Sequence, residues 1–399
     1  MLVTHPGTQH SFRLAAELEH RDALMGFYTG AAFTAGGLVD SVWQGLPGRW
    51  RRILERRRIA GLSPRHLHCR VAGEIAALWR LRGGADAQQV MHRRNKCFQE
   101  SIPDRALTTA SAVIGFDTAA WILCGRCQEH SVPIILDQSI GHPDTKIATY
   151  KLVREQYPEW SDGTEARRCE VREAERQEHE KTSCIVAGSS FVKQTLVDQG
   201  VAPEKIRVNP YGVDCQRFRV SRHRHSGPLR FLFVGGINAR KGVQLLIDAW
   251  RKLSTAGAEL WLVGGASKNV LELLPDLPGL RYLGRVPNEE VAELMQQCDV
   301  FVFPSYFEGL ALVILEAMAC GLPVITTSAS GGCDVITDGK DGWIIGPGDL
   351  TGLVDRMSYC LEHRQIVRDM GLAARATAER FTWSAYGDRW MQILAEVCG

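Results

Sequence analysis

The sequence predicts an α/β protein of two domains, each built on a parallel β-sheet that is covered by helices. Three observations support this fold class. The chain has 399 residues, which is too long for one compact core and fits two domains of ordinary size. Short apolar runs alternate with helical stretches in both halves, as expected when helices connect parallel strands. Hydrophobic residues form 45% of the chain and charged residues 23%, which is typical of a soluble globular protein.

The expected strands are short apolar runs bounded by polar or turn residues, a pattern typical of strands that are buried on both faces. In the first half they cover residues 23–28, 112–116, 133–136 and 184–187. In the second half they cover residues 229–234, 260–263, 300–303, 323–326 and 342–345. This regular recurrence predicts one parallel sheet in each half.

The segments between these strands complete the expected organisation. Residues 155–181 mix acidic and arginine residues at helical spacing, which predicts one long, solvent-facing helix with local ion pairs and no catalytic role. The turn residues Asn209 to Asp214 and the polar, basic residues 221–227 predict a linker, so the domain boundary is expected between residues 210 and 228. Residues 1–210 would form the first domain and residues 211–379 the second. Two facing parallel sheets would enclose a ligand-binding cleft lined by the loops that follow their strands.

The cysteine and hydropathy patterns exclude several classes of protein. The twelve cysteines are mostly scattered singly, which favours reduced thiols over a disulfide scaffold. Cys124 and Cys127 form the one C-x-x-C pair and lack the further ligands of a zinc site. The start of the chain does not resemble a signal peptide, and no run of some eighteen apolar residues occurs. We therefore expect a cytoplasmic protein without a bound metal.

A basic region lies in the first half. Residues 41–100 contain thirteen Lys and Arg against four Asp and Glu, and the charge is densest over residues 49–58. With Trp43 and Trp50 beside it, this region is a candidate for contact with an anionic membrane surface, because each basic residue near such a surface contributes about 1 kcal/mol. A solvated helix face is the alternative. No nucleic-acid-binding motif accompanies the charge, so nucleic acid is not expected as a partner.

The most informative segment is residues 299–325, which predicts a strand, a loop, a helix, a turn and a second strand. Gly309 would let the backbone approach a ligand closely. The amides of Leu310, Ala311 and Leu312 would lie free at a helix N-terminus, where an anion such as a diphosphate is stabilised.

Two glutamates accompany this loop. Glu308 lies at the mouth of the loop and Glu316 about two helical turns further along, so both can face one cleft at different depths. Carboxylates in such positions can hold ligand hydroxyls by charge-assisted hydrogen bonds. The spacing alone is not specific, and its surroundings supply the specificity.

This segment resembles the retaining glycosyltransferases of family four (glycosyl transferases group 1), whose hallmark is two glutamates with seven residues between them in the setting P-S-x-x-E-G…E-A-x-x-x-G-x-P-V. The resemblance covers residues 208–378. It includes Phe233 to Gly242, similar to the diphosphate-binding loop of the family, and Arg281 to Pro287, similar to its base-contacting turn. It implies the GT-B fold, in which two Rossmann-like domains face a central cleft and a C-terminal helix, here residues 380–399, crosses back to the first domain.

The resemblance also implies roles for the matching residues of the second domain. Lys241 would neutralise the nucleotide diphosphate, Glu308 would contact the donor sugar and Glu316 would bind the ribose hydroxyls. Arg285 and Val286 would belong to the base-contacting turn. A cationic clamp of this kind stabilises the negative charge that grows on a departing diphosphate, so no metal is required.

Other positions match less closely. Many members of the family have an arginine where Gly236 stands, so one cationic contact is either missing or supplied by Arg240 next to Lys241. Asp334 replaces a glutamate. In the first half, Gly7 would match a glycine loop that approaches the diphosphate. His142 would match a histidine near the donor sugar, although a hydrogen-bonded structural histidine is the alternative.

The implied reaction transfers a sugar from an α-linked nucleotide-sugar to an acceptor hydroxyl with retention, which gives an α-glycoside. The acceptor would attack on the face that the nucleotide leaves, with the enzyme supplying position and charge stabilisation. A glycan or a lipid-linked acceptor is expected, in bacterial surface polysaccharide or lipopolysaccharide assembly at the inner face of the cytoplasmic membrane. The alternatives are a small soluble metabolite as acceptor, a phosphorylase, and a non-catalytic sugar-nucleotide-binding protein.

Overall fold

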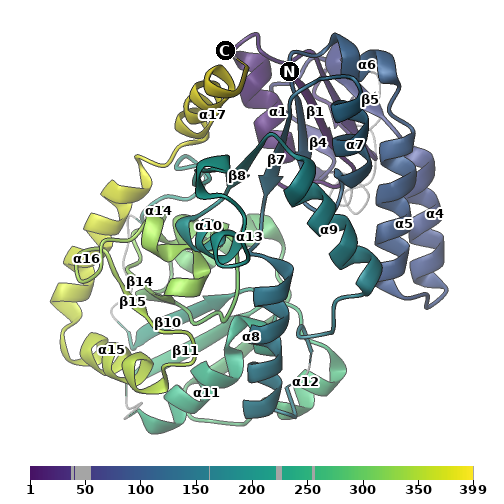
Figure 1. Ribbon diagram of the computed structural model, residues 1–399. Helices are drawn as coiled ribbons and strands as arrows, with labels where there is room; N and C mark the ends of the chain where they lie inside the picture. Colours follow the sequence, from purple (N-terminus) through teal and green to yellow (C-terminus); the bar gives the residue numbers. More distant parts are fainter. Residues whose placement is uncertain (37–39, 41–54, 161, 222–226, 254–256, 399) are drawn as a thin grey trace.

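Two parallel β-sheets organise the protein, as the sequence predicts (Figure 1). A computed structural model describes the chain except for residues 37–39, 41–54, 161, 222–226, 254–256 and 399. The first sheet has the strand order β5-β2-β1-β6-β7-β8-β9, and the second has the order β12-β11-β10-β13-β14-β15. Helices connect successive parallel strands in both domains, which is the Rossmann-like arrangement.

The strands of the first sheet are β1 (Leu2–His5), β2 (Gly26–Thr29), β5 (Leu67–Cys69), β6 (Val113–Phe116), β7 (Ile134–Gln138), β8 (Cys184–Ala187) and β9 (Ile206–Val208). Those of the second are β10 (Leu229–Val234), β11 (Ala258–Val263), β12 (Leu280–Gly284), β13 (Val300–Phe303), β14 (Val324–Thr327) and β15 (Gly342–Ile345). A two-stranded sheet pairs β3 (Phe33–Thr34) with β4 (Arg58–Ile59). All nine expected runs overlap strands, whereas β1, β3, β4, β5, β9 and β12 were not expected.

The helices of the first domain are α1 (Ser11–His20), α4 (Val71–Arg82), α5 (Ala87–Glu100), α6 (Asp104–Thr109), α7 (Trp121–Glu129), α8 (Pro143–Gln156), α9 (Cys169–Lys181) and α10 (Ser190–Val197). Those that follow β10 are α11 (Val243–Lys252), α12 (Lys268–Leu273), α13 (Asn288–Met295), α14 (Leu312–Ala319), α15 (Leu350–Glu362), α16 (Arg364–Ala378) and α17 (Trp383–Cys398). Within the described ranges, no helix is both long enough and apolar enough to cross a bilayer.

The prediction of a single helix over residues 155–181 is wrong. Helix α8 ends at Gln156 because the next residue, Tyr157, precedes Pro158, and a residue before proline disfavours the helical conformation. The chain then turns at Gly163 (φ +80°) and re-enters a helix at α9. Nor is α9 solvent-facing throughout, because the Glu178 carboxylate is buried and accepts hydrogen bonds of 2.8 Å from the amides of Thr118 and Ala120.

The end of the chain crosses back to the first domain, as expected. Helix α16 packs against α14 of the second domain, whereas α17 packs against α1 of the first (Figure 1). Asp388 on α17 pairs with Arg21 at 2.6 Å. The two connections between the domains lie against each other, because the Val213 amide donates to the Phe381 carbonyl at 2.8 Å. The contact is so close that a Cβ on Gly212 would lie 2.4 Å from the Trp383 nitrogen.

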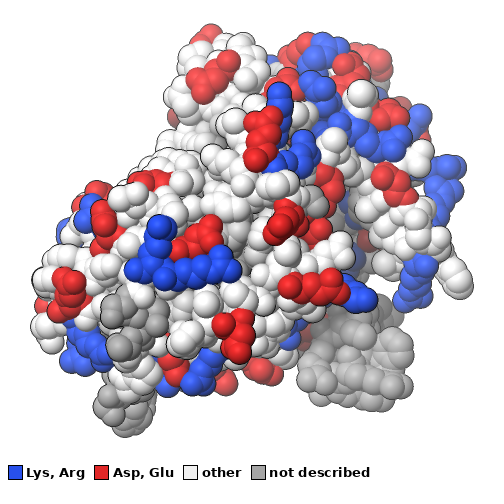
Figure 2. All heavy atoms as spheres, turned by 90° about the horizontal axis from the view of Figure 1, so that it is seen from below, with Lys and Arg blue, Asp and Glu red and all other residues white. Residues whose placement is uncertain are grey.

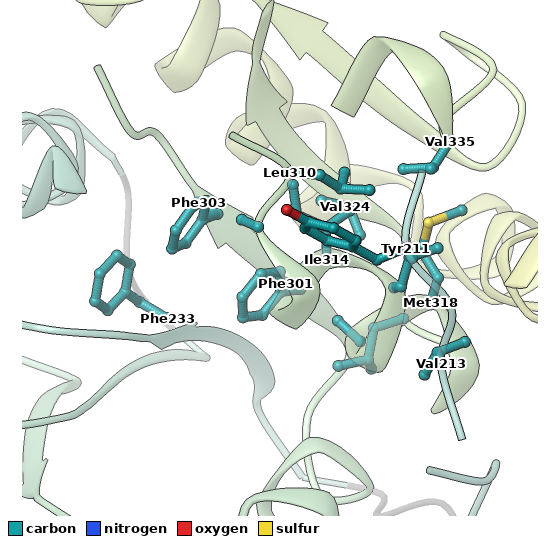
Figure 3. Close-up of a cluster of buried hydrophobic side chains, with 14 of the residues drawn as sticks. Tyr211, Val213, Phe233, Phe301, Phe303, Leu310, Ile314, Met318, Val324 and Val335 are labelled. Carbon is teal, nitrogen blue, oxygen red and sulfur yellow. The ribbon is translucent and has the colours of Figure 1, made fainter. Parts of the chain in front are cut away.

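A large apolar core supports the loop that follows β13 (Figure 3). Phe301 and Phe303 of β13 lie beside Phe233 of β10, and the Phe233 and Phe303 rings stack with their centroids 5.7 Å apart. Leu310 and α14 close the other side of this core, together with Tyr211 from the first connection between the domains. Dense packing of this kind leaves the loop little freedom to move, so it fixes the groups that the loop carries.

Candidate functional site

The loop between β13 and α14 is held in place by hydrogen bonds to its neighbours. The Ser305 hydroxyl and the Tyr306 amide both donate to the Arg240 carbonyl, at 3.0 and 2.9 Å. The Glu308 amide donates to the Ala329 carbonyl at 2.9 Å. The Ala311 amide donates to Ser330 at 3.2 Å, so it is not free as expected. In the first turn of α14 the Ile314 amide donates to the Ala311 carbonyl at 2.9 Å, whereas the amides of Leu312 and Val313 precede any intrahelical acceptor and remain suited to an anion.

Gly309 lies where the two domains meet. A Cβ at this position would be 1.8 Å from the Ser139 carbonyl oxygen of the first domain, so any side chain would push the domains apart. The Ser189 hydroxyl of the first domain donates to the Gly309 carbonyl at 2.8 Å. Both contacts lie at the carboxyl ends of strands, which is where parallel sheets bind ligands.

Glu308 is surrounded by positive charge. Its Oε1 accepts from Lys241 Nζ at 2.6 Å, from Ser305 Oγ at 3.0 Å and from the Arg240 guanidinium. Burial of this side chain opposes ionisation, but the two cations outweigh it and hold the pKa of Glu308 below its usual value. The carboxylate is therefore ionised at neutral pH, and a cationic pair lies at its side.

The loop that carries these cations has a compact shape. The Asn238 side chain accepts from the Lys241 amide at 3.1 Å and so caps the short helix η3 (Ala239–Lys241). A Cβ on Gly236 would lie 2.9 Å from Asn238 Nδ2, so a larger side chain would displace this cap. Arg240 is a second cation beside Glu308, and it also donates to the Phe307 carbonyl at 3.0 Å.

Glu316, on α14, has a different charged neighbour from Glu308. Burial raises its pKa to about 7, and Arg217 opposes that shift. The Arg217 guanidinium donates to the Asn288 carbonyl, which places it beside the turn that contains Val286 and Pro287. Arg217 was not foreseen as a site residue, because it belongs to the connection between the domains and to no motif of the second domain.

A cavity of about 1090 Å³ lies between the domains next to this turn. From the second domain it is lined by Arg217, Pro287, Asn288 and Glu289. From the first domain it is lined by Thr8, Gln9, Phe12, Arg13 and residues of the segment 55–60. Val286 packs against the core, whereas the Arg285 guanidinium lies over Gly265, where an added Cβ would be 2.8 Å away. Gly7 directly precedes Thr8, one of the residues that line this cavity.

His142 precedes α8 in the loop after β7. Its Nδ1 accepts from the Asp144 amide at 3.2 Å and so caps α8, and burial lowers the pKa of the ring. The ring lies 5.2 Å from that of His179 and lines a separate cavity of about 640 Å³ beside α9. The structure thus brings Ser139, not His142, to the Gly309 loop.

The first domain adds a polar cluster next to Ser139 that the sequence does not predict. The Ser139 hydroxyl donates to Asp117 at 2.8 Å, and burial raises the pKa of this carboxyl to about 6. Nearby, burial lowers the pKa of Lys146 to about 8. Glu175 pairs with Arg167 at 2.7 Å. Glu175 and Arg167 lie in the segment expected to have no catalytic role, and their opposite charges gave no sign that they interact with Asp117.

Comparison with known proteins agrees with this architecture. The crystal structure of the Anabaena protein HepE in complex with UDP-glucose superimposes with a TM-score of 0.66 at 16% identity, over 99% of both chains. The sulfoquinovosyl transferase SQD2 of Arabidopsis thaliana is 30% identical over 215 residues, which is 50% of this chain and 42% of that protein. The putative colanic acid biosynthesis glycosyltransferase WcaL of Salmonella typhimurium is 27% identical over 51% of this chain and 54% of its own length. The chain thus spans about half the length of the curated relatives it matches.

The chain has the GT-B fold, in which two Rossmann-like domains face each other. Residues 228–363 match the family described as glycosyl transferases group 1. The matched part of the second domain is therefore a glycosyl transferases group 1 domain.

Proposed function

We propose that the protein is a retaining glycosyltransferase that moves a sugar from an α-linked nucleotide-sugar to an acceptor hydroxyl and forms an α-glycoside. The observation that carries the proposal is the cluster of Glu308, Lys241 and Arg240 beneath the Gly309 loop, at the meeting point of the two domains. A buried carboxylate beside two cations offers partners for sugar hydroxyls and for a diphosphate in one place.

The donor would lie along the second domain. Its diphosphate would contact Lys241, Arg240 and the first turn of α14, where the amides and the helix dipole favour an anion. Its ribose would lie at Glu316 and its base at the turn of Arg285 and Val286. Because the diphosphate competes with Glu308 for the two cations, donor binding would release the Glu308 carboxylate to the sugar hydroxyls.

The two cations would also serve the chemical step. Negative charge grows on the diphosphate as the bond to the sugar breaks, and preorganised positive groups in a buried site stabilise that charge. Attack by the acceptor on the face that the nucleotide leaves gives retention, with a donor phosphate oxygen as proton acceptor. We propose that no metal is needed for this step.

The acceptor is proposed to be a glycan or a lipid-linked sugar in surface polysaccharide or lipopolysaccharide assembly, in the cytoplasm at the inner face of the membrane. The name of WcaL, a putative colanic acid biosynthesis glycosyltransferase, supports a role in polysaccharide assembly. Of the basic region 49–58 that was expected to contact the membrane, residues 49–54 lie outside the described residues, as do Trp43 and Trp50.

Thermal-shift measurements on the full chain with UDP, GDP, ADP and dTDP test the donor site, because a ligand that binds only the folded state raises the melting temperature. Selective stabilisation by one nucleotide, followed by hydrolysis of its sugar conjugates, would support the proposal and identify the donor. The anomeric configuration of the product, read from its NMR coupling constants, tests retention.

Other results would point to other functions. No stabilisation by any nucleotide would refute the donor site. Binding without turnover would indicate a non-catalytic protein, and a reaction that depends on inorganic phosphate would indicate a phosphorylase.

A further inference from the structure

Helix α4 has an unusual orientation at the outer edge of the first domain. It lies beyond α5, on which it packs (Figure 1). Its one acidic residue, Glu74, faces inward and is buried, and its carboxylate pairs with Arg94 at 3.0 Å and with Arg57 at 3.3 Å. A surface helix in water normally turns its apolar face to the core, so a buried carboxylate on α4 opposite exposed apolar residues is unusual.

The outward side of α4 is apolar. Val71, Ile75, Leu78 and Trp79 recur at helical spacing along one stripe, and all four are exposed, with Trp79 70% and Leu78 52% accessible. From typical side-chain areas, their exposed parts sum to roughly 400 Å². An exposed apolar patch of this size on one helix indicates a partner, since single exposed apolar residues alone would not.

Positive charge surrounds this stripe. Residues 65–96 contain seven Lys and Arg against two Asp and Glu, and one of these two acids is the buried Glu74. Arg80 and Arg82 on α4 are exposed, as are Arg93 and Lys96 on α5. Figure 2 shows Lys and Arg side chains along the side of the molecule where α4 and α5 lie.

We propose that α4 docks the protein on an anionic lipid bilayer, with the apolar stripe entering the interface and the surrounding basic residues contacting lipid phosphates. An amphipathic helix with a basic border binds anionic membranes in this way, by apolar burial together with charge attraction. A second copy of the chain fits less well, because it would bring the same positive charges. The stripe also offers about half of the ~800 Å² that each partner buries in a stable dimer.

The position of α4 in the fold connects membrane docking with a cavity of the first domain. Its first turn lines a cavity of about 330 Å³ together with Pro6 after β1, Gly30 after β2 and Arg70 after β5. This cavity therefore lies at the carboxyl ends of the strands, the edge that faces the cleft. If the proposed transfer reaction holds, a lipid-linked acceptor could stay anchored in the bilayer while its sugar entered this cavity; the docking itself does not depend on that reaction.

Co-sedimentation of the full chain with vesicles tests the proposal without donor or acceptor, so the result is independent of transferase activity. We expect binding to phosphatidylcholine vesicles that contain phosphatidylglycerol, and weaker binding without it. Leu78→Ser/Trp79→Ser should lower binding about tenfold or more through lost apolar burial. Arg80→Gln/Arg82→Gln should lower it by about fivefold per residue, which corresponds to ~1 kcal/mol each.

Leu372→Ser is the matched control, because Leu372 is an equally exposed leucine (60%) on α16 of the second domain, and its loss should leave binding unchanged. Unchanged nucleotide-induced thermal shifts, or unchanged circular dichroism if no nucleotide binds, establish that the variants fold. Failure of the wild type to bind anionic vesicles overturns the proposal, as does equal binding by the α4 variants. A wild-type dimer in sedimentation that these variants dissociate, without vesicle binding, would assign the stripe to self-association instead.

Discussion

Arg240 offers the sharpest test of the site, because the cation that many relatives carry at the position of Gly236 is absent here. The structure places the Arg240 guanidinium on Glu308, beside Lys241. If it contacts the departing diphosphate, two unit charges about 5 Å apart interact by about 3 kcal/mol at an effective dielectric constant of about 20. With part of a charge developing in the transition state, Arg240→Met should cost about 2–3 kcal/mol, or roughly 30- to 150-fold in kcat.

The assay is release of nucleoside diphosphate at saturating donor, with acceptor or by hydrolysis. Arg240→Lys keeps the charge but loses the planar fork of donors, so its rate should lie between those of wild type and Arg240→Met. Arg251→Met is the control, since Arg251 is exposed on α11 and pairs only with Asp248 at 3.0 Å among the described residues. A less than threefold loss of kcat in Arg240→Met, alongside a large loss in Lys241→Met, would refute the inference that Arg240 supplies the second cation.

Three further predictions follow from the same site. Gly309→Ala should lower the melting temperature and abolish donor hydrolysis, because its Cβ would lie 1.8 Å from the Ser139 carbonyl oxygen. The control is Gly125→Ala, whose Cβ would lie in open space on α7 and should not destabilise the protein. Nucleotide affinity, measured by calorimetry, should fall as the pH drops from 8 to about 6. The pKa of Glu316 is raised to about 7, and protonation removes the charged acceptor for the ribose hydroxyls. A pH dependence that persists in Glu316→Gln would contradict this explanation. Transfer should continue in excess EDTA, because Lys241, Arg240 and the α14 amides are proposed to supply the positive charge; loss of activity that Mg²⁺ or Mn²⁺ restores would show that a metal takes part.

The sequence was a good guide to buried strands and a poorer one to the others. Buried parallel strands appear as continuous apolar runs, which is why all nine expected runs overlap strands. Strand β1 escaped notice because Thr4 and His5 interrupt its apolar character, although both are buried and the Thr4 hydroxyl donates to the Ile114 carbonyl at 3.2 Å. Strands β5, β9 and β12 are sheet edges with partly exposed residues, so burial imposes no clear pattern on them.

The site, like the strands, could be predicted from the sequence only in part. The resemblance singled out Glu308, Lys241 and Arg240, and the structure brings them together because the loops after β10 and β13 leave neighbouring strands of one sheet. The position of His142 was not predictable, since the path of the loop after β7 decides which of its residues reaches Gly309. The exposure of α4 was equally hidden, because an apolar stripe at helical spacing has the same sequence pattern whether or not another element covers it.

The paired connections between the domains have a consequence for how the molecule holds together. Residues 212–213 and 381–383 contact each other, so the chain enters and leaves the second domain at the same place. While that domain is folded, it keeps α17 next to α1, and Tyr386 and Trp390 remain buried. If the second domain unfolds, α17 becomes the end of a long flexible loop, and the entropy of that loop opposes its return to α1. Folding of the second domain therefore stabilises the first. The unfolding of the two domains is coupled, as their ligand binding is proposed to be.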